Sequence, residues 1–254
     1  MLFLNHKRLV SQQYIVLLNN RMKKIVCLIF LFAFLNGHSQ VKGMFAKDPI
    51  TNLENFDKQR IHWGYFLGFN FYDFKFDYTE KTTDIIVEGT TGFNVGLVGN
   101  LRLHEYIDLR FEPGLYYTQR NLKYPLIDNE FDALREVKST YIHFPLLVKF
   151  SSKRIGNFKP YLVGGLSASL NLSSNAKAQD DNFNNRFRVN QWTTNYEMGF
   201  GVDLYFEYFK FSPSIRGVFS FNDELIRDND PNSPWTGTVE SMKTRGIFIN
   251  FTFH

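Results

Sequence analysis

Apolar and polar residues alternate one by one along eight segments of the chain, and this alternation constrains the fold more than any other feature. A period of two is typical of β-strands, because successive side chains on a strand point to opposite faces of the sheet. The segments cover residues 62–71, 92–103, 107–117, 141–150, 161–172, 192–204, 209–221 and 246–253. The sequence therefore predicts eight strands, each with two unlike faces.

One face of every predicted strand has no Asp, Glu, Lys or Arg. In the first strand this uncharged face consists of Trp63, Tyr65, Leu67, Phe69 and Phe71. Lipid favours such a face, because a charge at mid-bilayer costs roughly 2–4 kcal/mol on the outside of a barrel. The chain also has 28 Phe and 13 Tyr, which suits an apolar band bordered by aromatic girdles. The uncharged face is therefore predicted to meet lipid.

The opposite face holds nine charged residues, which we expect to form a structural network inside the barrel: Arg102, Asp108, Arg110, Glu112, Lys149, Glu197, Asp203, Lys210 and Arg216. The alternative is a soluble, lipocalin-like barrel, which would turn the bulky uncharged face inward and overfill its narrow lumen. We therefore predict an all-β fold, an eight-stranded antiparallel transmembrane up-and-down β-barrel.

The links between the predicted strands are alternately short and long. The short links lie near residues 104–106, 151–159 and 207–208. The long polar links lie near residues 72–91, 118–140, 173–191 and 222–245. Short periplasmic turns and long outer loops are typical of outer-membrane barrels. This layout places both chain ends on the periplasmic side, and an even number of strands lets the first and last strands pair.

The N-terminal region is predicted to direct export. Lys23 and Lys24 precede the apolar run 25–35, which has the length of a signal-peptide core and is too short to span a bilayer as a helix. A membrane anchor is the alternative interpretation. We predict an upstream extension of the gene model at 1–21, a signal peptide at 22–39, a periplasmic segment at 40–61 and the barrel domain at 62–254. Whether residues 41–61 form an extension, a plug or a disordered stretch stays open.

The leader also explains the basic balance of the chain. Residues 1–39 hold five basic residues and no acid, and taking these from 29 leaves 24 Lys and Arg against 25 Asp and Glu. The charge therefore gives no argument for nucleic-acid binding. Cys27, the only cysteine, lies in the leader. The mature chain is thus predicted to lack disulfides and Cys-zinc sites, and no cofactor or small-molecule substrate is evident.

Two charge pairs are expected inside the barrel. The short link near residue 105 places Arg102 opposite Asp108, and the link near residue 207 places Glu197 diagonal to Arg216. Eight strands enclose room for side chains only, not for an aqueous channel. We therefore expect a packed, charge-paired lumen and no transport path.

The signals for chemistry are weak. His62, His104 and His254 fall toward the short-turn rim and His143 lies in the fourth strand, so no Ser-His-acid set is expected at one rim. We predict that the protein is not an enzyme. Four oxygen-bearing residues crowd the last long loop: Asp223, Asp228, Asp230 and Asn232. Such loops can bind calcium, but without the EF-hand spacing a solvated turn is the favoured interpretation.

The second long loop has a helical spacing. Asp128, Phe131, Leu134 and Val137 could share one face of one or two helical turns. This spacing favours a folded cap on the loop over a helix that binds a partner.

The stretch Asn55–Phe74, with the sequence NFDKQRIHWGYFLGFNFYDF, resembles the start of the PorT family of Bacteroidetes outer-membrane barrels. Residues 101–117, 141–149 and 159–166 also resemble strands of that family. The resemblance implies a component of the type IX secretion system, located in the outer membrane after export through the periplasm. It brings no catalytic residue to this chain.

Two functions remain open on these grounds. The first, implied by the resemblance, is a non-catalytic assembly or accessory factor of the secretion machinery, with outer-membrane lipid and other secretion-system proteins as partners. The alternative is a general structural or surface-binding barrel whose long loops meet external ligands. The sequence does not identify the partner proteins or the loop that would contact them.

Overall fold

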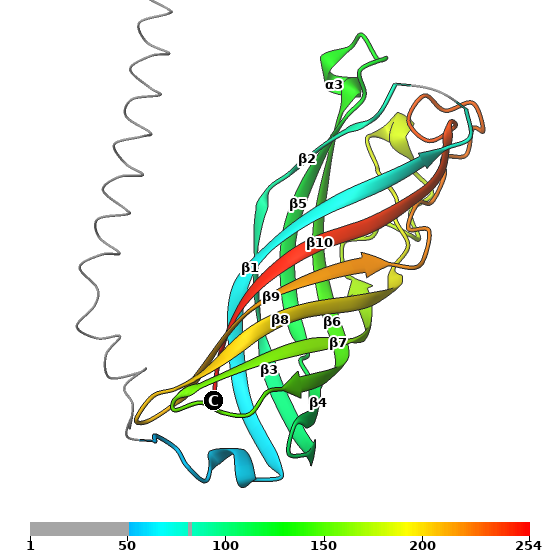
Figure 1. Cartoon of the computed structure of the whole chain (residues 1–254). Helices are drawn as coiled ribbons and strands as arrows, with labels where there is room; N and C mark the ends of the chain where they lie inside the picture. The colour runs from blue at the N-terminus through cyan, green and yellow to red at the C-terminus, as the bar shows by residue number, and fades with distance from the viewer. Residues whose placement is uncertain (1–50, 81–82) are drawn as a thin grey trace, which may run out of the picture. The chain divides into compact units, whose positions relative to one another are not determined.

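Figure 1 shows the computed structural model of the protein, which describes residues 51–80 and 83–254. The predicted upstream extension, the signal peptide and the first part of segment 40–61 lie outside the described residues. The strands are β1 (Ile61–Tyr78), β2 (Ile86–Gly89), β3 (Thr91–His104), β4 (Ile107–Phe111), β5 (Gly114–Lys123), β6 (Leu134–Ser151), β7 (Phe158–Asn171), β8 (Trp192–Tyr205), β9 (Lys210–Ser220) and β10 (Val239–Phe253). Short helical turns occur at η1 (Phe56–Lys58), α3 (Glu130–Ala133) and η2 (Asn182–Asn184). No helix in the described part of the chain is long and apolar enough to cross a membrane.

The ten strands form one antiparallel sheet, which confirms the predicted all-β class. β1 pairs with β10 along one edge and with β3 along the other. The remaining strands connect β3 to β10 in sequence order through β4 and β5, β6, β7, β8 and β9. These pairings join the sheet into a ring (Figure 1).

The ring is eight strands around, because two of its strands are each interrupted once. β4 and β5 keep one register against β6 on both sides of Pro113, where Phe111 lies opposite Leu146 and Gly114 lies opposite His143. Proline lacks the N–H that a continuous ladder requires, which accounts for this break. β2 continues the line of β3 beyond Thr90, pairing with the far end of β5.

The faces lie as the alternation predicts. Trp63 on β1 is 74% exposed and Leu97 on β3 is 63% exposed, whereas Phe66 and Asn70 on the opposite face of β1 are fully buried. The polar face therefore points into the barrel and the uncharged face points out. This orientation excludes the lipocalin-like alternative, in which the two faces would be exchanged.

Several strands run much further than the sequence predicts. β1 continues to Tyr78, β5 to Lys123, and β6 and β10 begin at Leu134 and Val239. The prediction that residues 72–91, 118–140 and 222–245 are entirely loop is therefore wrong. The period of two persists there, but the apolar side chains point inward and the charged ones outward. The charged outer positions therefore resembled a polar loop.

In these extensions β1 turns Phe74 and Phe76 inward and Asp73, Lys75 and Asp77 outward. We call the long-loop end of the barrel, beyond the level of Phe71 on β1, the cap. The inward side chains of the cap form a hydrophobic core: Phe74, Leu122, Tyr124, Val137, Phe187, Val189, Leu225, Trp235, Val239 and Met242. The predicted helical turns shrink to the single turn of α3, since Leu134 and Val137 belong to β6.

Candidate functional site

The middle of the lumen is crossed by a chain of buried charges. The Glu112 carboxylate lies between two arginines, at 3.2 Å from Nη1 of Arg110 and 2.9 Å from Nη1 of Arg216. Nε of Arg216 is also 3.1 Å from Oε2 of Glu197, an ion contact without hydrogen-bond alignment. All four side chains are nearly inaccessible to solvent. Mutual pairing offsets the cost of burying these ions, since a buried ion without a partner would be strongly destabilising.

A second buried cluster lies around Asp203. Nζ of Lys149 lies 2.6 Å from Oδ2 of Asp203, and Nζ of Lys210 lies 3.9 Å from the same atom. The Ser212 hydroxyl donates to Oδ1 at 2.6 Å. The structure thus brings seven of the nine predicted charges into two buried clusters.

Arg102 and Asp108 behave differently from the expected pair. They lie opposite each other in the β3–β4 register, but no ion pair of 4.0 Å or less between described residues joins their side chains. The guanidinium of Arg102 instead donates to the backbone carbonyl of Asp57 at 2.6 Å. The expected ion pair is therefore wrong, because residues 51–60 fold onto this end of the barrel and supply a competing acceptor.

His143 takes part in a contact that the sequence analysis missed. Nδ1 of His143 lies 2.7 Å from Oγ of Ser169, and Nε2 lies 2.6 Å from Oε1 of Glu197. A Ser-His-acid set is thus assembled in mid-lumen and not at a rim. A nucleophile acts only where a substrate reaches it, and here Ser169 is 5% exposed and accepts from Nδ2 of Asn195 at 3.0 Å. The only sequence signal for this set was that His143, Ser169 and Glu197 occupy inward positions on β6, β7 and β8.

Aromatic and aliphatic side chains fill the lumen on the long-loop side of these charges. They form one buried cluster: Phe66, Tyr72, Val98, Tyr116, Tyr141, Val218 and Phe248. A hollow beside it, lined by Tyr72, Tyr141, Glu224 and Thr244, has a volume of about 10 Å³. This is about the space of one water molecule. The middle of the barrel is therefore packed.

Residues 51–60 close the lumen at the end where the turns are short. The Phe56 ring stacks on His62 with centroids 4.7 Å apart, and Nζ of Lys210 lies 4.7 Å from the Phe56 centroid. Asp57 accepts from the Tyr205 hydroxyl at 2.6 Å and pairs with Lys159 at 3.2 Å. Burial opposes ionisation of Asp57, but these partners hold its pKa below the ordinary value. Of the three possibilities left open, the described part of this segment forms a plug.

At the long-loop end, buried polar side chains join strands to one another and a loop to a strand. Arg120 on β5 donates to the Tyr141 hydroxyl at 2.6 Å and lies 3.7 Å from the Phe74 ring centroid. The Glu224 carboxylate accepts from the backbone and the hydroxyl of Thr244 at 3.0 and 2.9 Å, and burial raises the pKa of Glu224. Neither group was predicted, because Arg120 and Glu224 fall in the segments 118–140 and 222–245, which the sequence predicts to be loops.

The acid-rich last loop is more ordered than a solvated turn. Asp228 is 8% exposed, and its carboxylate accepts from Nδ2 of Asn182 at 2.9 Å and from Oγ1 of Thr236 at 3.0 Å. The interpretation of this residue as part of a solvated turn is therefore wrong. Among the described residues, no group of three or more His, Cys, Asp or Glu could hold a metal ion.

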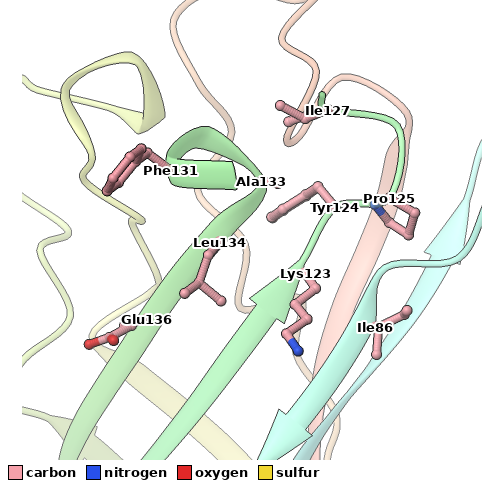
Figure 2. A pocket seen from close by; sticks show the side chains of 9 residues that line it. All are labelled: Ile86, Lys123, Tyr124, Pro125, Ile127, Phe131, Ala133, Leu134 and Glu136. Carbon is pink, nitrogen blue, oxygen red and sulfur yellow. The ribbon is translucent and has the colours of Figure 1, made fainter. Parts of the chain in front are cut away.

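An open pocket of about 800 Å³ lies on the cap, where the β5–β6 hairpin meets β2 (Figure 2). It is lined by Ile86, Lys123, Tyr124, Pro125, Ile127, Phe131, Ala133, Leu134 and Glu136. Phe131 on α3 is 88% exposed. Its turn is fixed by Asn129, whose side chain accepts from the Phe131 N–H at 3.1 Å. The pocket is mostly apolar and its exposed aromatic wall is held in place.

One family model matches the chain, and several solved structures are similar to it. The model of the family described as outer membrane protein beta-barrel domain matches residues 45–225. Similar solved structures include the outer membrane protein OprG from Pseudomonas aeruginosa, with 17% identity over 76% of this chain and 94% of that chain and a TM-score of 0.38. The outer membrane protein AlkL shares 12% identity over 82% and 93%, with a TM-score of 0.43. Neisserial surface protein A shares 11% over 76% and 98%, with a TM-score of 0.39. No curated protein matches the chain.

Proposed function

Since the chain belongs to the outer membrane protein β-barrel domain family, we propose that it acts in the outer membrane by contact with other proteins and not by conduction. The packed lumen is the observation that carries this proposal. Glu112, Arg216 and Glu197 are in ion contact across the lumen, and Phe56 stacks on His62 at the short-turn end. Neither a polypeptide nor a hydrated solute passes through a lumen filled by side chains.

The more specific role is a non-catalytic assembly or accessory factor of the type IX secretion system. Its support is the resemblance of Asn55–Phe74 to the PorT family. In the fold this stretch comprises the end of the closing segment and most of β1. The resemblance therefore covers the region that closes the lumen as well as a strand.

The orientation follows the usual layout of outer-membrane barrels, with short turns in the periplasm and long loops outside. Residues 51–60 then face the periplasm and the cap faces the exterior. Contacts with other secretion proteins run through these two ends or through the lipid-facing wall.

A general surface-binding barrel is the second candidate. It is favoured by the exposed Phe131 beside the 800 Å³ pocket on the cap, because exposed apolar surface in water often marks an interaction site.

A clean deletion strain tests the secretion role. We expect cargo of the type IX system to accumulate in the periplasm while other outer-membrane proteins assemble normally. Normal cargo export from the deletion strain would reject this role and leave the surface-binding candidate standing. In that case a Phe131→Ser variant, which keeps the buried core intact, tests the cap by loss of binding to the cell exterior or matrix.

A further inference from the structure

A cleft of about 300 Å³ opens at the short-turn end, between residues 51–60, the β3–β4 turn and the β6–β7 turn. We call it the basal cleft. Five basic side chains line it: Lys58, Arg102, Lys153, Arg154 and Lys159. Three carboxylates also line it: Glu54, Asp57 and Glu105. The lining therefore carries more positive than negative charge.

Most of these cations are satisfied by neutral oxygens. Arg154 donates to the Gly156 carbonyl at 2.7 Å and to the Asn52 carbonyl. Arg102 donates to the backbone carbonyl of Asp57, and Lys58 donates to the side-chain oxygen of Asn55 at 2.9 Å. A neutral oxygen satisfies the N–H group but leaves the charge uncompensated.

Within the described residues, the only ion pair of 4.0 Å or less among the residues that line the cleft joins Lys159 to Asp57. Lys153 is exposed. Lys58, Arg102, Lys153 and Arg154 therefore have no carboxylate of the described residues at ion-pair distance.

More positive charge lies directly behind the cleft. Lys149 and Lys210 share the single carboxylate of Asp203. Burial and the nearby Lys210 and Arg110 lower the pKa of the His254 imidazole, which is consistent with a positive potential at this end of the barrel.

We propose that the basal cleft binds an acidic segment of a partner protein. This inference rests on the proposed function and adds the place and the chemistry of the contact. The cleft has room for a few side chains and not for a folded element. Fixed cations next to water steer and hold carboxylates on an extended chain.

A partner protein is favoured over a lipid headgroup because of where the cations lie. Arg102 and Lys159 stand on inward-facing positions of β3 and β7, and Lys159 is 8% exposed. The cleft therefore lies at the short-turn end of the barrel and not on the lipid-facing wall.

Binding of a fluorescent decaglutamate peptide to the full-length protein in detergent micelles tests the proposal by anisotropy. We expect binding that weakens as salt is raised and that falls by about tenfold or more in the double variant Lys58→Glu, Lys153→Glu. Both side chains are exposed, so the barrel should stay folded, which gel mobility with and without heating verifies. The matched control is Lys177→Glu with Lys243→Glu, the same charge change at the long-loop end, which should leave binding unchanged.

Equal binding by wild type, double variant and control would overturn the proposal. Native mass spectra in which the double variant loses bound phosphatidylglycerol, while peptide binding is unchanged, would assign the cleft to lipid phosphates and also overturn it.

The same variant in cells separates this inference from the secretion role. If deletion blocks export but the folded double variant restores it fully, the cleft is not the contact and the secretion role survives. If deletion leaves export normal, the secretion role fails, and the peptide measurement alone decides whether the cleft binds acidic chains.

Discussion

The barrel has two regions built from the same strands, the cap and the part below it, which reaches Phe71 on β1 and which we call the band. Their faces are opposite in chemistry. In the band, ion pairs such as Arg216–Glu112 lie inside and apolar side chains lie outside. In the cap most ion pairs lie outside, and the apolar cluster around Leu122 lies inside. The outer ion pairs on the strands of the cap are Asp73–Arg245, Lys75–Asp77, Glu88–Lys123 and Glu136–Lys138.

On β1 the change falls between two outward neighbours. Phe71 lies opposite Ile247 of β10, and Asp73 lies opposite Arg245. Residues 61–71 match the 9–11 residues that a tilted strand needs to cross the hydrocarbon layer. The comparison teaches that solvent decides which face is apolar, because lipid takes apolar side chains outside and water drives them inside. The cap is thus a water-soluble barrel continuing a membrane barrel.

Breaking the charge network of the band should have the largest effect. Glu112→Ala leaves Arg110 and Arg216 without their shared carboxylate in the buried lumen. Removal of one member of a buried ion pair costs about 3–5 kcal/mol. Urea unfolding of the barrel in lipid vesicles measures this loss. The stability of the isosteric variant Glu112→Gln is expected to lie between those of the wild type and Glu112→Ala. An unchanged unfolding midpoint for Glu112→Ala would mean that the network does not stabilise the band.

The cap should respond to the opposite kind of change. Leu122 is fully buried in its hydrophobic core, and Leu→Ala substitutions in cores cost about 2–5 kcal/mol. We expect Leu122→Ala to speed hydrogen exchange in the cap while the amides of the band stay protected. Uniformly faster exchange over both regions would show that they do not form separate units of stability.

Arginine introduced on the outer face of the band and on that of the cap tests the two faces directly. Leu97→Arg places a charge on the lipid-facing wall and should cost roughly 2–4 kcal/mol. Leu166→Arg should behave alike. The control Asn121→Arg, at an outward position of β5 in the cap, should change stability by no more than about 0.5 kcal/mol. The account of the faces fails if the variants at residues 97 and 121 lose the same stability in vesicles.

The smallest effect concerns the closing segment. The pKa of Asp57 is lower in the folded protein than its ordinary value of 3.8. The carboxylate therefore stabilises the closed end above that ordinary pKa, and this contribution is lost as the pH falls through the lowered one. Hydrogen exchange of residues 51–60 should rise in that acid range in wild type and be independent of pH there in Asp57→Asn. The same pH dependence in both would assign the effect to another group.

The sequence predicts the band well because a single rule, an outer face without charged residues, holds from Ile61 to Phe71 and on the other seven strands. The cap was missed because the same rule reverses at Asp73, and a search for uncharged outer faces stops there. Local pattern could not decide for the plug either, since Phe56 and Asp57 also take their places from contacts with Lys210 and Tyr205, which lie far away along the chain.

The charge network was predicted in composition and in one pair, Glu197 with Arg216, but not in its other pairings. Glu197 and Arg216 meet because the turn between β8 and β9 is short, which the sequence displays. Glu112 receives Arg216 from across the lumen, and such a contact depends on how the ring closes.

The level at which lipid gives way to water is the central claim, and spin labels on β1 test it most directly. Single cysteines at Phe69, Phe71, Lys75 and Asp77, in the protein reconstituted in bilayers, would carry nitroxides on the outward face. We predict that labels at 69 and 71 are relaxed mainly by oxygen, and that labels at 75 and 77 are relaxed mainly by a water-soluble nickel complex. Oxygen-dominated relaxation at all four positions would place the outer wall of the cap in lipid and contradict the account.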